Sequence, residues 1–429
     1  MFFSLKSIFN YAKLFSWMGV FYTNYRIYGK CNLIILQILL KNIQCTSSLG
    51  IKVIQKVVPY LKMGDCDTEI INILSSTYEN NIYHDDSFTK KLFIDDFGID
   101  LSKKYEIVDK ISSGSIGQVY KVRGINDNKF YAMKVVHPNI QDQLHFIKRV
   151  IKLFNLNKYK LFELNNFIKN YEKETNLIHE AYNMKIFYNY YKNNDRIIIP
   201  KLYDFSQNII IMEYIEGENI EELSSYERVK YLAFIFIFCN INKKILNFNH
   251  GDMHFGNFKK IDGERIVIYD FGFCFEVIDD EIVNILDNCW HSLLDHKEAK
   301  YSFIHCVKYI IRYHLEVDDI DKYEDIIKEI FLQEKIRDLD VLFNKIYTFF
   351  KRIDVKIKME FLNLMLIYLH TSKYDECEMQ DLLTLCLHYD IFPDYVELIK
   401  DTMYYRGSNI SKYSKNKNAN IEEDLKKLL

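Results

Sequence analysis

Successive strand-like runs occur in two stretches of this chain, and this restriction limits the folds that it can adopt. Between the two stretches, about residues 143–193 have the polar–apolar spacing of helices. The patterns therefore predict a small β-rich lobe that also carries helical segments. The runs rich in β-branched and aromatic residues lie at 105–112, 118–122 and 130–136, and again at 196–204 and 208–215.

Helical spacing dominates the remainder of the chain, apart from one short strand predicted at 265–270. The 49% hydrophobic and 27% charged residues are enough for a sizeable core, and 4 Pro and 14 Gly are too few for an all-β architecture built on tight turns. We predict an α+β, bilobal fold with a helical N-terminal extension at 1–104, a β-rich N-lobe at 105–215, a helical C-lobe at 216–408 and a disordered tail at 409–429.

Charge is distributed unevenly along the chain. The first 64 residues contain eight Lys or Arg and no Asp or Glu, whereas the other 365 residues carry a net charge of −11. Basic residues interleaved with Phe, Trp, Tyr and Leu are typical of an amphipathic element that lies on an anionic membrane. A basic helical hairpin packed on the acidic body would explain the same composition, so both interpretations stay open. No apolar stretch reaches the ~18 residues of a membrane span.

The nine cysteines are scattered and form no C-x-x-C pair. This usage favours reduced thiols, and therefore an intracellular, reducing compartment, over a disulfide framework or a zinc ribbon. The basic segment adds peripheral membrane association as a hypothesis. We expect no nucleic-acid partner.

A glycine-containing loop lies between the first two predicted strands. Residues 112–119 read Ser-Ser-Gly-Ser-Ile-Gly-Gln-Val and fit the pattern G-x-G-x-x-G-x-V, with Ser112 in place of the first glycine. Small residues there let backbone N–H groups approach the phosphates of a nucleotide, and a lysine in the next strand pairs with the α- and β-phosphates. Taken alone, each piece also fits an ordinary hairpin with an exposed lysine. The candidate nucleotide contacts are Ser113, Gly114, Ser115, Gly117, Val119 and Lys134.

Residues 250–257, His-Gly-Asp-Met-His-Phe-Gly-Asn, form the most specific motif. Phosphoryl transfer needs a carboxylate to orient the attacking hydroxyl and an amide oxygen to hold magnesium, and Asp252 and Asn257 have the five-residue spacing of kinase catalytic loops. Asp270 begins an Asp-Phe-Gly sequence at the end of a predicted strand, where a carboxylate can chelate the same ion. We expect His250 and His254 to hydrogen-bond this loop into shape and not to bind a metal.

The order of these motifs predicts a protein-kinase-like fold that uses ATP and Mg²⁺. In this interpretation Asp252 and Lys134 are catalytic residues, and Asn257 and Asp270 are the metal ligands.

The same residues resemble the UbiB family of atypical kinases (aarF-domain or "ABC-one" kinases). The similarity covers roughly residues 50–277 and includes Ser-Ile-Gly-Gln-Val at 115–119, Met-Lys-Val-Val-His-Pro at 133–138, an E-x-D…E-A-x-N helix and the catalytic loop. The resemblance implies that Glu174, the first residue of the E-x-D-like motif, is the acidic partner of Lys134. It also implies that the hinge residues Glu213 and Ile215 contact the nucleotide.

The family also carries a K-x-G-Q motif in a helical extension over the nucleotide cleft. Its best match is Lys-Val-Ile-Gln at 52–55, which keeps Lys52 and Gln55 as implied nucleotide-site residues but replaces the glycine with Ile54. An ordinary basic helix is the alternative. Asn176 replaces the E-x-D aspartate, and residues 112–114 replace an alanine-rich loop. These departures, beside intact catalytic residues, favour retained nucleotide chemistry with altered regulation.

Three functions remain open. The first is a UbiB-like kinase or ATPase that transfers or hydrolyses the γ-phosphate, and the second is a scaffold that senses nucleotide without transferring phosphate. The third is a small-molecule kinase of the aminoglycoside or choline kinase type, because these enzymes share the loop H-G-D-x-H-x-x-N. For the first function, the resemblance implies an isoprenoid-lipid or small-molecule acceptor.

Overall fold

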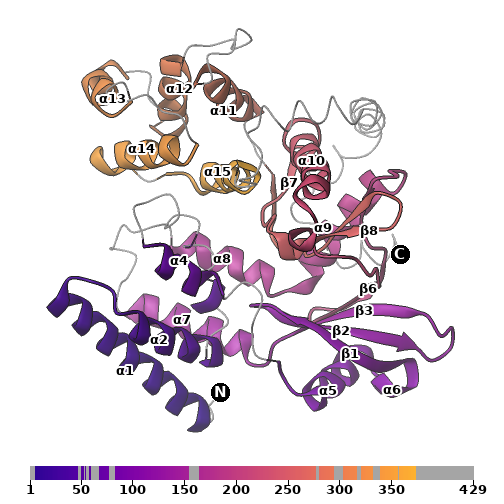
Figure 1. The fold of residues 1–429 in the computed structure, drawn as a ribbon. Helices are drawn as coiled ribbons and strands as arrows, with labels where there is room; N and C mark the ends of the chain where they lie inside the picture. Colours follow the sequence, from indigo (N-terminus) through magenta and orange to yellow (C-terminus); the bar gives the residue numbers. More distant parts are fainter. Residues whose placement is uncertain are drawn as a thin grey trace. The chain divides into compact units, whose positions relative to one another are not determined.

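The computed structural model divides into two compact units, each assembled from separate segments of the chain (Figure 1). The first unit contains Met1–Tyr159, Phe167–Ile178 and Leu202–Tyr214, and the second contains Lys160–Asn166, His179–Lys201 and Ile215–Leu429. The predicted tail and most of residues 51–61 of the predicted helical extension lie outside the described residues. The structure describes residues 5–46, 50–52, 54, 58, 67–76, 83–153, 164–276, 280–293, 303–315, 320–331, 339–355 and 357–372.

The first unit contains an antiparallel sheet of five strands. Its strands follow the predicted runs closely, and β3 coincides with the prediction at 130–136. The spatial order is β1 (Tyr105–Ser113), β2 (Gly117–Gly124), β3 (Phe130–Val136), β6 (Ile209–Glu213) and β5 (Leu202–Phe205). The helices of this unit are α1 (Leu5–Tyr28), α2 (Leu33–Thr46), α4 (Thr68–Ser75), α5 (Asp86–Phe97), α6 (Leu101–Lys104), α7 (Ile140–Leu153) and most of α8 (Leu164–Glu174).

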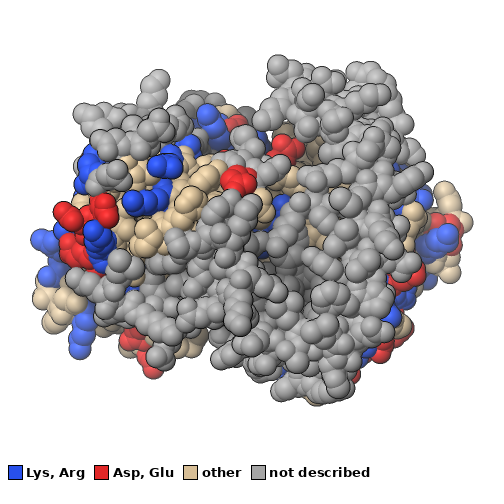
Figure 2. All heavy atoms as spheres, turned by 90° about the horizontal axis from the view of Figure 1, so that it is seen from above, with Lys and Arg blue, Asp and Glu red and all other residues tan. Residues whose placement is uncertain are grey.

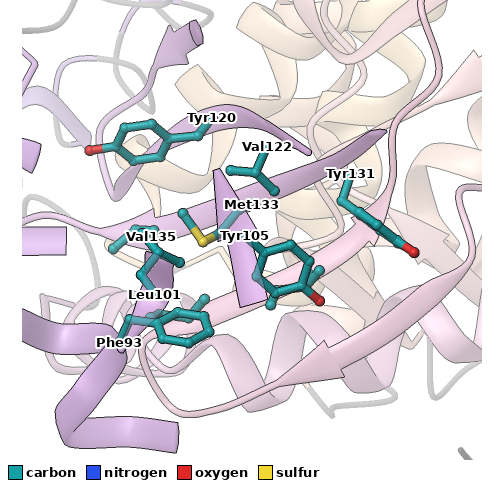
Figure 3. Packing of buried hydrophobic residues seen from close by; sticks show 10 residues of the cluster. Phe93, Leu101, Tyr105, Tyr120, Val122, Tyr131, Met133 and Val135 are labelled. Carbon is teal, nitrogen blue, oxygen red and sulfur yellow. The ribbon is translucent and has the colours of Figure 1, made fainter. Parts of the chain in front are cut away.

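Two short helices close one face of this sheet (Figure 3). Asp85 caps α5 by accepting from the backbone N–H of Ser87, and Asp100 caps α6 in the same way. The helices bring the buried side chains of Phe93 and Leu101 to the sheet, where they join Tyr105, Tyr120, Val122, Tyr131, Met133, Val135, Ile209 and Ile211 in one hydrophobic cluster. Burial of this apolar surface holds α5 and α6 on the sheet, although both precede the predicted lobe boundary at residue 104.

The second unit is mainly helical but contains more strands than the sequence predicted. β8 (Phe258–Ile261) and β9 (Arg265–Ile268) form a hairpin with β4 (Ile197–Ile198) at its edge, and β7 (Phe248–His250) pairs with β10 (Cys274–Glu276). Of these, only β4 and β9 lie in predicted strands. The α-helices are most of α9 (Leu177–Tyr191), α10 (Ser225–Ile241), α11 (Asp280–Leu293), α12 (Phe303–Leu315), α13 (Glu324–Phe331), α14 (Leu339–Arg352) and α15 (Met359–Ser372).

The prediction of one strand at 196–204 is wrong. The chain forms β4 and β5 instead, and these strands belong to different sheets and different units. Pro200 lies between them. A proline has no backbone N–H for a ladder hydrogen bond and has a fixed φ, so the run cannot continue as one strand.

The described surface is mixed in charge. On the face drawn in Figure 2, basic and acidic side chains lie beside one another. Ion pairs such as Lys148–Glu172 and Lys328–Glu324 join exposed side chains, so each contributes little to stability. Among the helices that the structure describes, none has an apolar stretch long enough to span a lipid bilayer.

Gly117 lies where β2 approaches the backbone of β3. A Cβ atom at this position would lie 2.5 Å from the carbonyl oxygen of Val135, a distance that no real Cβ tolerates. Gly114 is different, because the nearest atom to a Cβ there would be the carbonyl oxygen of Gly117 at 3.7 Å, an ordinary contact. The fold therefore requires glycine at 117 but not at 114.

We predict that Gly117→Ala lowers the free energy of unfolding by about 1–3 kcal/mol, the usual result of forcing extra volume into packed backbone. Gly114→Ala, the matched control in the same turn, should change it by less than about 0.5 kcal/mol. Urea unfolding of both variants measures the difference. Equal losses would show that the tight contact at Gly117 does not limit the fold.

Candidate functional site

The first unit brings the predicted phosphate-binding residues together in one hairpin. The turn between β1 and β2 is closed by a hydrogen bond from the N–H of Gly114 to the carbonyl oxygen of Gly117, at 2.9 Å. Ser113 and Ser115 are buried in this turn. Val119 on β2 stands opposite Lys134 on β3 in the ladder, and the side chain of Lys134 is buried as well. The turn and the lysine thus belong to one rigid piece of sheet.

The predicted hinge begins at the end of β6. Glu213 is the last residue of that strand and pairs with Tyr131 of β3. Ile215 follows in the second unit, where its carbonyl oxygen accepts a hydrogen bond from the hydroxyl of Tyr269 at 2.8 Å. Each hinge residue is therefore anchored within its own unit.

A buried ion pair joins Lys52 to Glu174. The ammonium nitrogen of Lys52 lies 2.9 Å from a carboxylate oxygen of Glu174, and the two side chains are 9% and 5% exposed. Both residues belong to the first unit. The ion pair recorded for Glu174 is therefore with the lysine of the K-x-G-Q-like motif, whereas its predicted pairing with Lys134 stays a prediction. Gln55 lies outside the described residues.

Asn176, which replaces the aspartate of the E-x-D motif, caps α9. Its side-chain oxygen accepts from the backbone N–H of Ile178 at 3.1 Å, which satisfies one of the free donors at the start of the helix. The amide oxygen performs the capping role of a carboxylate at this position without adding a negative charge.

In the second unit, the β7–β10 ladder places the predicted catalytic loop beside the Asp-Phe-Gly segment. His250 stands opposite Cys274, and the N–H of Gly251 donates to the carbonyl oxygen of Phe273 at 2.8 Å. The N–H of Tyr269 donates to the carbonyl oxygen of Asn257, also at 2.8 Å. The loop and the segment that contain Asp252, Asn257 and Asp270 are therefore held together by backbone hydrogen bonds.

The side chain of Asn257 has a fixed orientation. Its Nδ2 donates to the carbonyl oxygen of Asp252 at 2.7 Å, and the residue is buried. Since the amide nitrogen is engaged by the loop, the amide oxygen is the atom that remains to accept a cation. Asp252 itself is half-buried and Asp270 is exposed. Hard carboxylate and amide oxygens such as these are the ligands that Mg²⁺ prefers.

His250 shapes the loop, as predicted. Its Nε2 donates to the carbonyl oxygen of Tyr269 at 3.1 Å, and its Nδ1 accepts from the N–H of Asp252 at 3.3 Å. Burial lowers the pKa of His250 below its ordinary value of 6.5, although the Tyr269 carbonyl and the carboxylates of Asp252 and Asp270 oppose the shift. The neutral ring therefore fixes the backbone on both sides of the site. His254 accepts from the N–H of Gly256 and caps the short helix Phe255–Asn257.

Helix α9 supplies two residues that the sequence analysis did not assign to the site. Asn183 donates from its Nδ2 to the carbonyl oxygen of Phe271 at 2.8 Å. The carboxylate of buried Glu180 lies 3.3 Å from the position that a Cβ on Gly272 would occupy. Glu180 and Asn183 are three residues apart and so share a helix face, and this spacing in E-A-x-N is the signal that could have placed both beside Asp-Phe-Gly.

Asp270 has a backbone conformation that side chains rarely adopt. Its φ is 53°, in the left-handed region, and its carboxylate accepts from the N–H of Gly272 at 3.2 Å. Aspartate tolerates this region better than most residues because of such local hydrogen bonds. A non-glycine residue held there is a frequent feature of functional sites.

The antiparallel sheet of the first unit and the helical second unit, with these motifs on them, define a protein-kinase-like fold, as the sequence predicted. The chain belongs to the family of the ABC1 atypical kinase-like domain, whose model matches residues 82–305. This match confirms the predicted resemblance to the UbiB family of atypical kinases.

Two curated relatives come from Arabidopsis thaliana. One is an uncharacterized chloroplastic aarF domain-containing protein kinase, 24% identical over 46% of this chain and 30% of its own length. The other is the chloroplastic protein ACTIVITY OF BC1 COMPLEX KINASE 3, 26% identical over 47% of this chain and 31% of its own length. The chain thus spans about a third of the relatives that it matches. A solved Rv3197–erythromycin complex from Mycobacterium tuberculosis is 16% identical, with a TM-score of 0.44 over 67% of this chain and 80% of that one.

We predict that the Lys52–Glu174 pair behaves as a buried ion pair. Lys52→Met or Glu174→Gln alone should lower the free energy of unfolding by about 3–5 kcal/mol, because each leaves a charge or polar group without its partner. The double variant should lose much less than the sum of the two, since no charge is then left unpaired. Urea unfolding of the four proteins in a double-mutant cycle measures the coupling.

The matched control is the exposed pair Lys148–Glu172, because Glu172 and Glu174 lie on the same helix. Removing either side chain of the control pair should lower the free energy of unfolding by less than about 1 kcal/mol. A coupling for Lys52–Glu174 as small as that of the control would contradict a buried pair.

Proposed function

We propose that this chain is an atypical kinase or ATPase that binds Mg-ATP and transfers or hydrolyses its γ-phosphate. The observation that carries the proposal is the frame of backbone and side-chain hydrogen bonds around Asp252, Asn257 and Asp270, in which His250 and Asn183 hold the loop and the Asp-Phe-Gly segment. Such preorganisation is what phosphoryl transfer requires of a protein.

Each residue would have a defined role. Lys134 and the turn at 113–119 would hold the phosphates, with Glu213 and Ile215 at the adenine side. Asn257 and Asp270 would bind Mg²⁺, which neutralises charge on the phosphates when it is bound. Among the described residues, no cluster of three or more His, Cys, Asp or Glu could hold a metal alone. A magnesium ion that arrives with the nucleotide needs only one or two protein ligands.

Asp252 would orient the acceptor hydroxyl or a water molecule. Its half-buried carboxylate starts from a backbone fixed by His250 and Asn257, so little reorganisation is needed. We propose an isoprenoid-lipid or other small-molecule acceptor, from the family resemblance alone. A nucleotide-sensing scaffold is the competing function, because binding requires the same magnesium ligands.

We predict that Mg-ATP or Mg-ADP stabilises the folded chain, by about 2.7 kcal/mol at a hundredfold excess over Kd. Asp270→Asn should remove the magnesium-dependent part of the rise in Tm. Asp354→Asn is the matched control, since Asp354 is also an exposed aspartate with a left-handed φ, of 56°. No rise in Tm of the wild type at millimolar Mg-ATP would refute nucleotide binding.

Turnover distinguishes the enzyme from the scaffold. Asp252→Asn is nearly isosteric and should leave ATP affinity almost unchanged while it lowers phosphate release or transfer ~10²–10⁴-fold, the usual effect of losing a positioned acid or base. The assay uses labelled ATP with isoprenoid lipid or detergent micelles. If the wild type binds ATP but is as slow as Asp252→Asn under all conditions, the scaffold is the better account.

We also propose that α1 carries the chain to an anionic membrane surface. Met18, Tyr22, Tyr25 and Tyr28 on this helix are 47–66% exposed, and the segment has no acidic residue. Apolar side chains beside Arg26 and Lys30 fit an interface in which each basic residue contributes on the order of 1 kcal/mol. A reducing compartment is our accompanying proposal. It is supported by the five cysteines whose side chains the structure describes, since none of these five forms a disulfide.

The membrane proposal predicts that Arg26→Glu with Lys30→Glu weakens co-sedimentation of the full chain with phosphatidylserine vesicles, and that salt does the same to the wild type. Lys90→Glu with Lys91→Glu, two exposed residues of α5, makes the same change in net charge and is the control. An equal loss of co-sedimentation in the two double variants would favour the basic helical hairpin over membrane binding by α1.

A further inference from the structure

Two imidazole rings meet behind the glycine-containing turn of the first unit. His84 lies just before α5 and His137 just after β3, and their Nδ1 atoms are 3.0 Å apart. The Nε2 of His137 lies 3.0 Å from the carbonyl oxygen of Gly114, and its backbone N–H donates to the carbonyl oxygen of Ile116 at 2.9 Å. The same Nε2 also lies 3.4 Å from the hydroxyl of Ser113, so one residue contacts the turn at three points.

The carbonyl group of Gly114 determines which nitrogen of each imidazole ring carries the proton. The Gly114 oxygen can only accept, so the Nε2 of His137 must be the donor. In a neutral ring the Nδ1 of His137 is then an acceptor, and the Nδ1 of His84 must donate to it. The Nε2 of His84 is therefore an acceptor as well.

Two further groups complete the chain of hydrogen bonds. The Nε2 of His84 lies 2.9 Å from the hydroxyl oxygen of Thr89, which must donate to it. The Thr89 oxygen can then accept from the hydroxyl of Tyr120, at 2.7 Å. Thr89 and Tyr120 are fully buried. The hydroxyl of Tyr120 also lies 3.2 Å from a carboxylate oxygen of Asp86, to which it can donate instead. From Thr89 to the Gly114 carbonyl, each donor points toward the turn.

The backbone of His84 is fixed separately by Gln118. The N–H of His84 donates to the Oε1 of Gln118 at 2.8 Å, and the Nε2 of Gln118 donates back to the His84 carbonyl at 3.5 Å. Gln118, from the Ser-Ile-Gly-Gln-Val motif, is completely buried. Its side chain therefore holds the backbone of His84, whose ring is hydrogen-bonded to His137.

A proton on both facing Nδ1 atoms would leave two donors and no acceptor, so the two rings cannot both be charged, and the proton positions given above are those of two neutral rings. Burial lowers the pKa of His84 to about 4, aided by His137 and Lys110 and opposed by Asp86 and Asp85. Burial also lowers the pKa of His137, which the bond to Gly114 opposes. The series of hydrogen bonds is thus intact near neutral pH. Its contribution to the free energy of unfolding is lost as the pH falls from 6.5 toward 4.

We propose that His84 and His137 are positioning residues, which hold the turn at Ser113–Gly117 in place for a nucleotide through this directed hydrogen-bond chain. The proposal rests on the proposed function only for the identity of the ligand. The histidines fix the turn in the unliganded protein. The order of the turn is therefore measured without nucleotide.

The first experiment is NMR of the full chain with ¹⁵N-labelled histidine at pH 7. His137 should be the neutral Nε2–H tautomer and His84 the less common neutral Nδ1–H tautomer, each assigned by loss of its signal in a variant. The opposite tautomers, or a charged ring at either position, would overturn the proposed direction of the hydrogen bonds.

The second experiment compares hydrogen exchange in His137→Phe, His137→Gln and the wild type. His137→Phe removes both ring hydrogen bonds and should speed exchange in residues 112–118 roughly tenfold, about the contribution of one hydrogen bond. His137→Gln keeps a donor for Gly114, so its exchange rate in these residues should lie between those of His137→Phe and the wild type. His314→Gln is the control, because burial also lowers the pKa of His314, to about 4, but His314 lies on α12. Unchanged exchange in the turn of both His137 variants would overturn the proposal.

Mg-ATP affinity of the same proteins connects the turn to the ligand. His137→Phe should bind roughly tenfold more weakly than the wild type, and His314→Gln should bind equally well. If the wild type binds no nucleotide, the proposed function fails, while hydrogen exchange still decides whether the histidines fix the turn. If exchange speeds up but affinity does not change, the histidines support the fold and are not positioning residues for a nucleotide.

Discussion

In both units, a neutral imidazole shielded from water holds a loop of the candidate site by donating to a backbone carbonyl. His137 donates to Gly114 in the first unit and His250 donates to Tyr269 in the second, and in each ring the other nitrogen accepts a hydrogen bond. A protonated ring would lose the acceptor nitrogen and would place a charge in a partly or fully desolvated position. Both loops therefore depend on burial deep enough to keep the rings neutral, which couples the hydrophobic packing of each unit to the geometry of its loop.

The aromatic core explains how such burial arises near exposed loops. Phe187 and Phe271 lie against His250, with ring centroids 6.3 Å and 5.3 Å from the imidazole. In the first unit the rings of Phe88 and Tyr120 lie 5.2 Å and 6.2 Å from His84. Large rings exclude water from the imidazoles while leaving their edge nitrogens free to hydrogen-bond. The apolar side chains thus determine the protonation state of the polar ones.

The sequence predicted the strands of the five-stranded sheet, apart from the break at Pro200, and it predicted the motif at 250–257, because both are visible as local patterns. It did not predict β7, β8 and β10, because three or four residues are too short to show a period of two. Nor did it predict that Glu174 pairs with Lys52. The choice between lysines far apart in the sequence depends on tertiary packing, which local patterns do not contain. His84 and Gln118 were missed as partners for the same reason.

The Lys52–Glu174 pair also extends the functional unit beyond the family match. Lys52 precedes residue 82, where the matched segment begins, whereas Glu174 lies inside it. Removing two charges from water costs several kcal/mol per ion unless they meet with good geometry, so the pair persists only if both segments are ordered together. The helices before residue 82 are therefore part of the folded unit that contains Glu174.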